Sequence, residues 1–133
     1  MKKKDTIAQQ SIAEKVAIFA DARKAQDIAI YNVQNVLGYC DYIVIATGTS
    51  DRHVQSIADH VEQEMSKLGL KAIGMEGIRQ AQWVLVDFGS IVLHVFHPFT
   101  RDVYKLESLW EKAQKLTWSP PVAQTLSMAT AVG

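Results

Sequence analysis

The turn Gly48-Thr49-Ser50 is the part of the sequence that most resembles a phosphate site. It lies between a run of β-branched residues and an amphipathic segment, and amides at the start of a helix attract phosphate. The turn lacks the lysine and the glycine spacing of a P-loop, and it is not a GxGxxG motif. A glycine-serine turn also opens the nucleotidyltransferase motif, but that motif needs paired carboxylates on a strand to hold magnesium. No predicted strand carries such a pair, so we favour a tight turn with a helix cap and keep a nucleotide-binding enzyme as the alternative.

Histidines and the lone cysteine do not form a metal or nucleophile site. His94 and His97 are three residues apart on a predicted strand, which places them on opposite faces. His53 and His60 lie two helical turns apart, without a nearby set of cysteines or carboxylates. Cys40 has no evident base beside it and is expected to be a small buried residue. The sequence therefore predicts no catalytic residue, no metal and no cofactor.

The periodicity of apolar residues indicates the elements that position these groups. We expect a helix over 6–26, strands over 27–33 and 42–46, a helix from Ser50 to Gly69, strands over 71–74, 83–88 and 91–97, and a last helix from Phe99 that stops beyond Lys115. The order α-β-β-α-β-β-β-α predicts an α/β fold, with a single mixed sheet of about five strands and helices packed against it.

Length and charge narrow the class of protein. The 133 residues fit one domain, expected over 1–116, and residues 117–133 have no period and are expected to form a flexible tail. The 14 basic side chains are balanced by 14 acidic ones, which argues against binding through RNA phosphates. A single cysteine, no signal-peptide core and no apolar run near ~20 residues favour a cytoplasmic protein without a membrane span.

A predicted hairpin joins 83–88 to 91–97 through Gly89-Ser90. Such a short loop fixes which residues face each other. One face is entirely apolar, with the pairs Phe88–Ile91, Val86–Leu93 and Val84–Val95. The other face is mixed, with the pairs Asp87–Val92, Leu85–His94 and Trp83–Phe96. Either the last helix covers the aromatic pair and leaves His94 and Asp87 at the rim, or the mixed face is exposed and binds a partner.

Four stretches of the chain resemble the Iojap family, the bacterial ribosomal silencing factors. They are DYIVIATGTSDRHV at 41–54 with Ile57-Ala58-Asp59, Glu76-Gly77, WVLVDFGSIVLHVF at 83–96, and YKLESLW at 104–110. Together they cover about residues 10 to 114 in the family's order and spacing.

This resemblance implies a nucleotidyltransferase-like fold without metal-binding carboxylates and without enzymatic activity. It implies binding to large-subunit ribosomal protein fourteen, which blocks joining of the subunits and represses translation. Relatives in organelles serve large-subunit assembly, which is the alternative role. The implied partner surface comprises Trp83, Asp87, His94 and Phe96, with Glu76 as a weaker candidate.

The mixed hairpin face and the family surface coincide, and this favours the binding interpretation. We expect Trp83 and Phe96 to be the apolar anchors, with Leu85 filling between them. Asp87 and His94 are expected to orient a basic ribosomal partner. The same face could instead close a homodimer of the free protein.

Overall fold

The computed structural model describes residues 2–36, 38, 40–104 and 113–118. Its elements are α1 (Lys2–Ala22), β1 (Gln26–Asn32), β2 (Tyr42–Thr47), α2 (Asp51–Lys67), β3 (Gly74–Glu76), β4 (Trp83–Asp87), β5 (Ile91–Phe96), α3 (Pro98–Tyr104) and β6 (Gln114–Leu116). The predicted α/β class is confirmed, with helices packed against one mixed sheet. Among the described residues, none of the helices has the length and apolar character needed to cross a bilayer.

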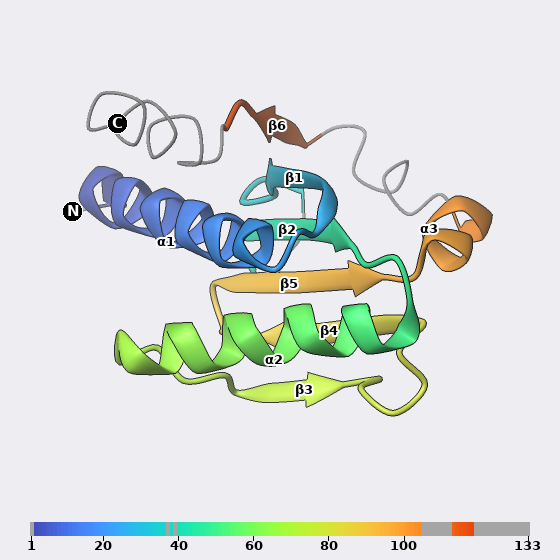
Figure 1. The fold of residues 1–133 in the computed structure, drawn as a ribbon. Helices are drawn as coiled ribbons and strands as arrows, with labels where there is room; N and C mark the ends of the chain where they lie inside the picture. The colour runs from blue at the N-terminus through green and yellow to red at the C-terminus, as the bar shows by residue number, and fades with distance from the viewer. Residues whose placement is uncertain (1, 37, 39, 105–112, 119–133) are drawn as a thin grey trace, which may run out of the picture.

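The sheet has six strands in the order β3-β4-β5-β2-β1-β6. Strands β2 and β5 run parallel, and the other neighbouring pairs are antiparallel. Helices α1 and α2 lie side by side on one face of this sheet, while α3 lies beyond the carboxyl ends of β2 and β5 (Figure 1). Neither α1 nor α2 covers the opposite face of the sheet (Figure 1).

The centre of the sheet is buried on both faces. Every residue of β2 and of β5 is buried, as the continuous apolar run 42–46 predicts for a central strand. The larger core cluster lies between the sheet and the two long helices. A smaller cluster lies on the opposite face and includes Tyr31, Ile43, Val92 and Phe96.

Helix α2 begins as its sequence predicts. The Ser50 hydroxyl accepts the backbone N–H of His53 at 3.1 Å, which makes Ser50 the N-cap. Gly48 lets the helix start close to the strand, because a Cβ there would lie 2.8 Å from the Val54 backbone nitrogen. The spacing of apolar residues in α2 places Leu68 and five others on one face; Leu68, at the C-cap, is 49% exposed, and the others are buried: Val54, Ile57, Ala58, Val61 and Met65.

The main differences from the predicted elements concern α1, β3 and β6. Helix α1 starts at Lys2, earlier than expected. It also ends earlier, at Ala22, because Lys24 adopts a left-handed backbone (φ 61°) and Ala25 N–H returns to the Ala20 carbonyl. The short strand expected over 71–74 lies at Gly74–Glu76. The chain expected to be helical up to Lys115 instead contributes β6, which pairs with β1 and raises the strand count to six.

Parts of the last helix and of the tail lie outside the described residues. These are 105–112 and 119–133. The first residues assigned to the tail are described, and Trp118 packs against the core cluster beneath α1. Its indole N–H donates to the Ile28 carbonyl at 3.1 Å.

Candidate functional site

The hairpin register agrees with the prediction residue for residue. Trp83 faces Phe96, Leu85 faces His94, and Asp87 faces Val92. Strand β3 extends the same face, because Glu76 lies opposite Leu85 on the far side of β4. Since directly paired residues share a face, the six predicted partner-binding residues lie together. We call them the hairpin face: Glu76, Trp83, Leu85, Asp87, His94 and Phe96.

Exposure on the hairpin face rises from β5 towards the sheet edge. Phe96 and His94 are 0% and 4% exposed, whereas Trp83 on β4 is 38% exposed. Leu85 and Asp87 are half-buried, and Glu76 on the edge strand is exposed. A docking partner can therefore reach β3 and β4 but not the side chains of β5.

The prediction that Phe96 and His94 are exposed is wrong. Strand β5 is not an outer strand of the hairpin but lies between β4 and the buried strand β2. On that strand Ile45 lies beside His94, and Thr47 lies beside Phe96. Phe96 belongs to the smaller core cluster, so its ring supports the face from beneath.

Three rings stack in a fixed arrangement under the exposed edge. The centroids of Trp83 and Phe96 are 5.3 Å apart with an interplanar angle of 35°. His94 and Phe96 lie 6.0 Å apart and are inclined by only 9°. The indole N–H of Trp83 donates to Nδ1 of His94 at 3.0 Å. Aromatic packing and this hydrogen bond together hold the half-exposed tryptophan in one orientation.

Asp87, one of the two acidic residues of the hairpin face, stabilises the hairpin turn. The Asp87 carboxylate accepts the N–H of Gly89 at 2.7 Å, and Gly89 adopts φ 92°, which glycine tolerates. Glu76 is the second acid, and the six residues include neither lysine nor arginine. The hairpin face is therefore an aromatic and apolar surface with negative charge, which suits a basic partner.

Gly77 belongs to one of the stretches that resemble the family, but no structural role was predicted for it. It follows β3 with φ +83°, and a Cβ at this position would collide with the carbonyl oxygen of Trp83. The glycine thus lets the connection from β3 fold back closely over the start of β4. The signal was present in the sequence, because Gly77 stands between the predicted strand and Trp83.

Replacing Gly77 with alanine is expected to lower the free energy of unfolding by more than about 1 kcal/mol, because the left-handed backbone and the collision are both unfavourable. Urea unfolding measures this loss. Gly74→Ala is the matched control in the same segment, since a Cβ there meets nothing within 4 Å. Equal stabilities of the two variants would contradict the assigned role of Gly77.

The pH dependence of stability is expected to contain a contribution from His94. Burial lowers the pKa of this imidazole from 6.5 to about 4. Between these values the unfolded chain binds a proton that the folded chain does not, so the free energy of unfolding falls as the pH is lowered from about 6.5 to about 4. Urea unfolding across this range measures the slope. The variant His94→Asn should show a shallower dependence, and an unchanged slope would place His94 outside the buried environment.

Two backbone N–H groups of the turn at Gly48 donate hydrogen bonds to other groups of the protein. Gly48 N–H donates to the Phe96 carbonyl at 2.9 Å, and Thr49 N–H donates to Nδ1 of His53 at 2.8 Å. The Nε2 of His53 in turn lies 2.7 Å from the Arg23 carbonyl oxygen. These contacts tie α2 to β5 and to the end of α1, which supports the favoured interpretation of the turn as a structural connection.

The described residues contain no group of three or more histidines, cysteines and acids that could hold a metal ion. His97 lies away from the hairpin face, with its Nε2 4.0 Å from the Asp51 carboxylate. Cys40 is buried, and burial raises the pKa of its thiol to about 11, so the reactive thiolate is disfavoured at neutral pH.

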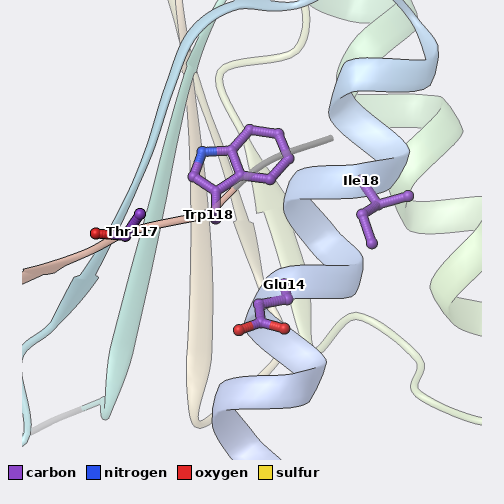
Figure 2. A pocket seen from close by; sticks show the side chains of 4 residues that line it. All are labelled: Glu14, Ile18, Thr117 and Trp118. Carbon is purple, nitrogen blue, oxygen red and sulfur yellow. The ribbon is translucent and has the colours of Figure 1, made fainter. Parts of the chain in front are cut away.

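A pocket of about 300 Å³ opens on the other side of the sheet. Its lining comprises Glu14, Ile18, Thr117 and Trp118, from α1 and from the chain after β6 (Figure 2). Trp118 packs against the cluster beneath α1, whereas Phe96 belongs to the cluster on the opposite face. The pocket and the hairpin face are thus separate features.

Comparison with known proteins gives one consistent set of relatives. The sequence model of a family described as "Ribosomal silencing factor during starvation" matches residues 6–131. The chain is 39% identical to ribosomal silencing factor RsfS of Bacillus subtilis, over 79% of this chain and 89% of the relative. It is 37% identical to "Mitochondrial assembly of ribosomal large subunit protein 1" of mouse, over 65% of this chain and 39% of the relative. A crystal structure of a Chromobacterium violaceum protein superposes with a TM-score of 0.75 at 32% identity, covering 83% of this chain and 91% of that chain.

Proposed function

Because the chain belongs to the family of ribosomal silencing factors, we propose that it binds the large ribosomal subunit and prevents the small subunit from joining it. Bound in this way, the protein represses translation. The observation that carries the proposal is the half-exposed Trp83, held in one orientation on β4 within a hairpin face whose six residues include two acids and neither lysine nor arginine.

The partner we propose is large-subunit ribosomal protein fourteen, docked on the exposed part of the hairpin face. Trp83 inserts into the partner, and Leu85 fills the space beside it. Glu76 and Asp87 face the positive charges of a basic ribosomal protein, and this complementarity sets the orientation of docking. His94 and Phe96 support the Trp83 ring from inside the protein. They do not touch the partner, because both are buried.

The proposed mechanism is steric and requires no bond to be made or broken. A protein bound where the small subunit docks competes with it directly, so the chain acts as a binding protein and not as an enzyme. The neutral overall charge is consistent with a grip on a ribosomal protein and little direct contact with RNA. Its place of action is the cytoplasm, where bacterial ribosomes are found.

Sedimentation of purified ribosomal subunits tests this function. Subunits mixed at a magnesium concentration that favours joining should stay separate when the protein is added in excess over large subunits. The separation should be relieved when free large-subunit ribosomal protein fourteen is added as a competitor. Normal joining at saturating protein would rule the proposal out.

Assembly of the large subunit is a second candidate function, and the name of the mouse relative favours it. An assembly factor would leave the joining of mature subunits unchanged, and its depletion from cells would cause large-subunit precursors to accumulate. Sucrose-gradient profiles of depleted cells therefore separate the two roles.

The free protein could bury the hairpin face in a homodimer, and we propose this as its resting state. Sedimentation equilibrium of the wild-type chain should then give a mass that rises with concentration towards twice 14.8 kDa. A monomer mass at all concentrations would eliminate the dimer without affecting the proposed binding to the ribosome.

A further inference from the structure

His94 contacts the exposed tryptophan but is itself shielded from a partner. Only 4% of the residue is exposed, and its Nδ1 accepts the indole N–H of Trp83 at 3.0 Å. An indole has a single N–H group and no acceptor, so this bond uses the whole hydrogen-bonding capacity of the Trp83 side chain. Trp83 therefore offers a partner its ring surface, and His94 determines how that ring is turned.

The histidine ring is fixed in its turn by the core. It lies nearly parallel to Phe96, with 6.0 Å between centroids and 9° between planes, and Phe96 is fully buried. Because Nδ1 is the acceptor, the proton of the neutral imidazole is on Nε2. Burial disfavours the imidazolium form, which could not accept the indole N–H. Phe96 therefore contacts both His94 and Trp83, and His94 adds the one hydrogen bond that orients the indole.

We propose that His94 is a positioning residue for partner docking, holding the Trp83 indole through Nδ1 in the orientation that the partner recognises. The proposal rests on the proposed function, in which Trp83 is the apolar anchor. Pre-organisation is the physical reason for the effect. An indole that is already oriented loses less rotational freedom on binding than one that must be ordered at the interface.

Two substitutions with the same number of side-chain heavy atoms separate this role from simple packing. In His94→Asn, the amide oxygen can occupy the place of Nδ1 and accept the indole N–H. In His94→Leu, the side chain has the same number and branching of heavy atoms as asparagine but no acceptor. Both variants lose the ring contact with Phe96 to the same degree. Leucine suits a buried site better than asparagine, so His94→Leu should be at least as stable as His94→Asn.

The experiment measures stability by urea unfolding and affinity for purified large ribosomal subunits by sedimentation binding. We expect His94→Asn to bind within about threefold of the wild type and His94→Leu to bind about tenfold more weakly, as the loss of one hydrogen bond allows. His94→Asn should thus bind more tightly than His94→Leu, although it is expected to be no more stable. A residue that only packs the core would give affinities that follow stability.

An independent readout is the exchange of the Trp83 indole proton with water, followed by NMR and assigned with Trp83→Phe. Exchange should be slow in the wild type and in His94→Asn, and fast in His94→Leu. If His94→Leu binds as tightly as the wild type while Trp83→Ala binds weakly, the positioning role is overturned and the docking surface stands. If Trp83→Ala also binds as the wild type does, the docking surface falls, and the positioning role falls with it.

Discussion

Replacing Phe96 with alanine is expected to lower the free energy of unfolding by about 3–4 kcal/mol. The side chain is 0% exposed, belongs to the smaller core cluster, and packs against the rings of both Trp83 and His94. Alanine would leave a cavity on the face of the sheet that α1 and α2 do not cover. Urea unfolding at neutral pH, followed by far-UV circular dichroism, measures the loss.

Phe99→Ala is the matched control for this prediction. It removes the same number of atoms only three residues away, but Phe99 is 69% exposed, so its loss should change stability by no more than about 0.5 kcal/mol. Similar losses in the two variants would show that Phe96 is not part of the core. The comparison also guides binding studies, because weaker binding of Phe96→Ala reports a damaged fold and not a lost contact.

The hairpin was predictable because its register depends on local geometry alone. Once Gly89 and Ser90 form the loop, every pair from Trp83–Phe96 to Phe88–Ile91 follows by counting. The same holds for the start of α2, where Ser50 follows a β-branched run and caps an amphipathic segment. In both places the residues that decide the structure are neighbours in the sequence.

The exposure of the face was not predictable, because it depends on the order of strands. The sequence indicates that Phe96 and His94 share a face with Trp83, but not that β5 pairs with β2 on its other side. That parallel pairing joins segments about fifty residues apart and buries both side chains. Strand β6 was missed for a related reason, since three residues are too few to show an alternation and its partner β1 lies far away in the sequence.

The contact between Trp83 and His94 was predictable from the sequence only in part. The two residues are not directly paired, but His94 is two positions from Phe96, which makes it the diagonal neighbour of Trp83. Diagonal neighbours in an antiparallel pair are within reach of a long aromatic side chain. The register therefore permits the hydrogen bond, and only the side-chain orientations in the folded chain select it.

Replacing Trp83 with alanine is expected to weaken binding to the large ribosomal subunit by about thirtyfold, which corresponds to about 2 kcal/mol. The indole is 38% exposed on a rigid strand, and its loss removes the largest apolar contact that the hairpin face can offer. The variant should also fail to keep the subunits apart at protein concentrations that are sufficient for the wild type. Sedimentation binding and subunit joining measure the two effects.

The fold should survive this change, because Trp83 covers Phe96 from the solvent side and does not fill the interior. Leu68→Ala is the matched control, since Leu68 is a 49% exposed apolar residue beside α2, which covers the other face of the sheet. It should bind as the wild type does. Trp83→Phe should bind with intermediate affinity, since it keeps an aromatic ring over Phe96 but loses the hydrogen bond to His94. If Trp83→Ala and Leu68→Ala bind equally well, the partner docks elsewhere, and the exposed edge of β3 and β4 is not the surface that separates the subunits.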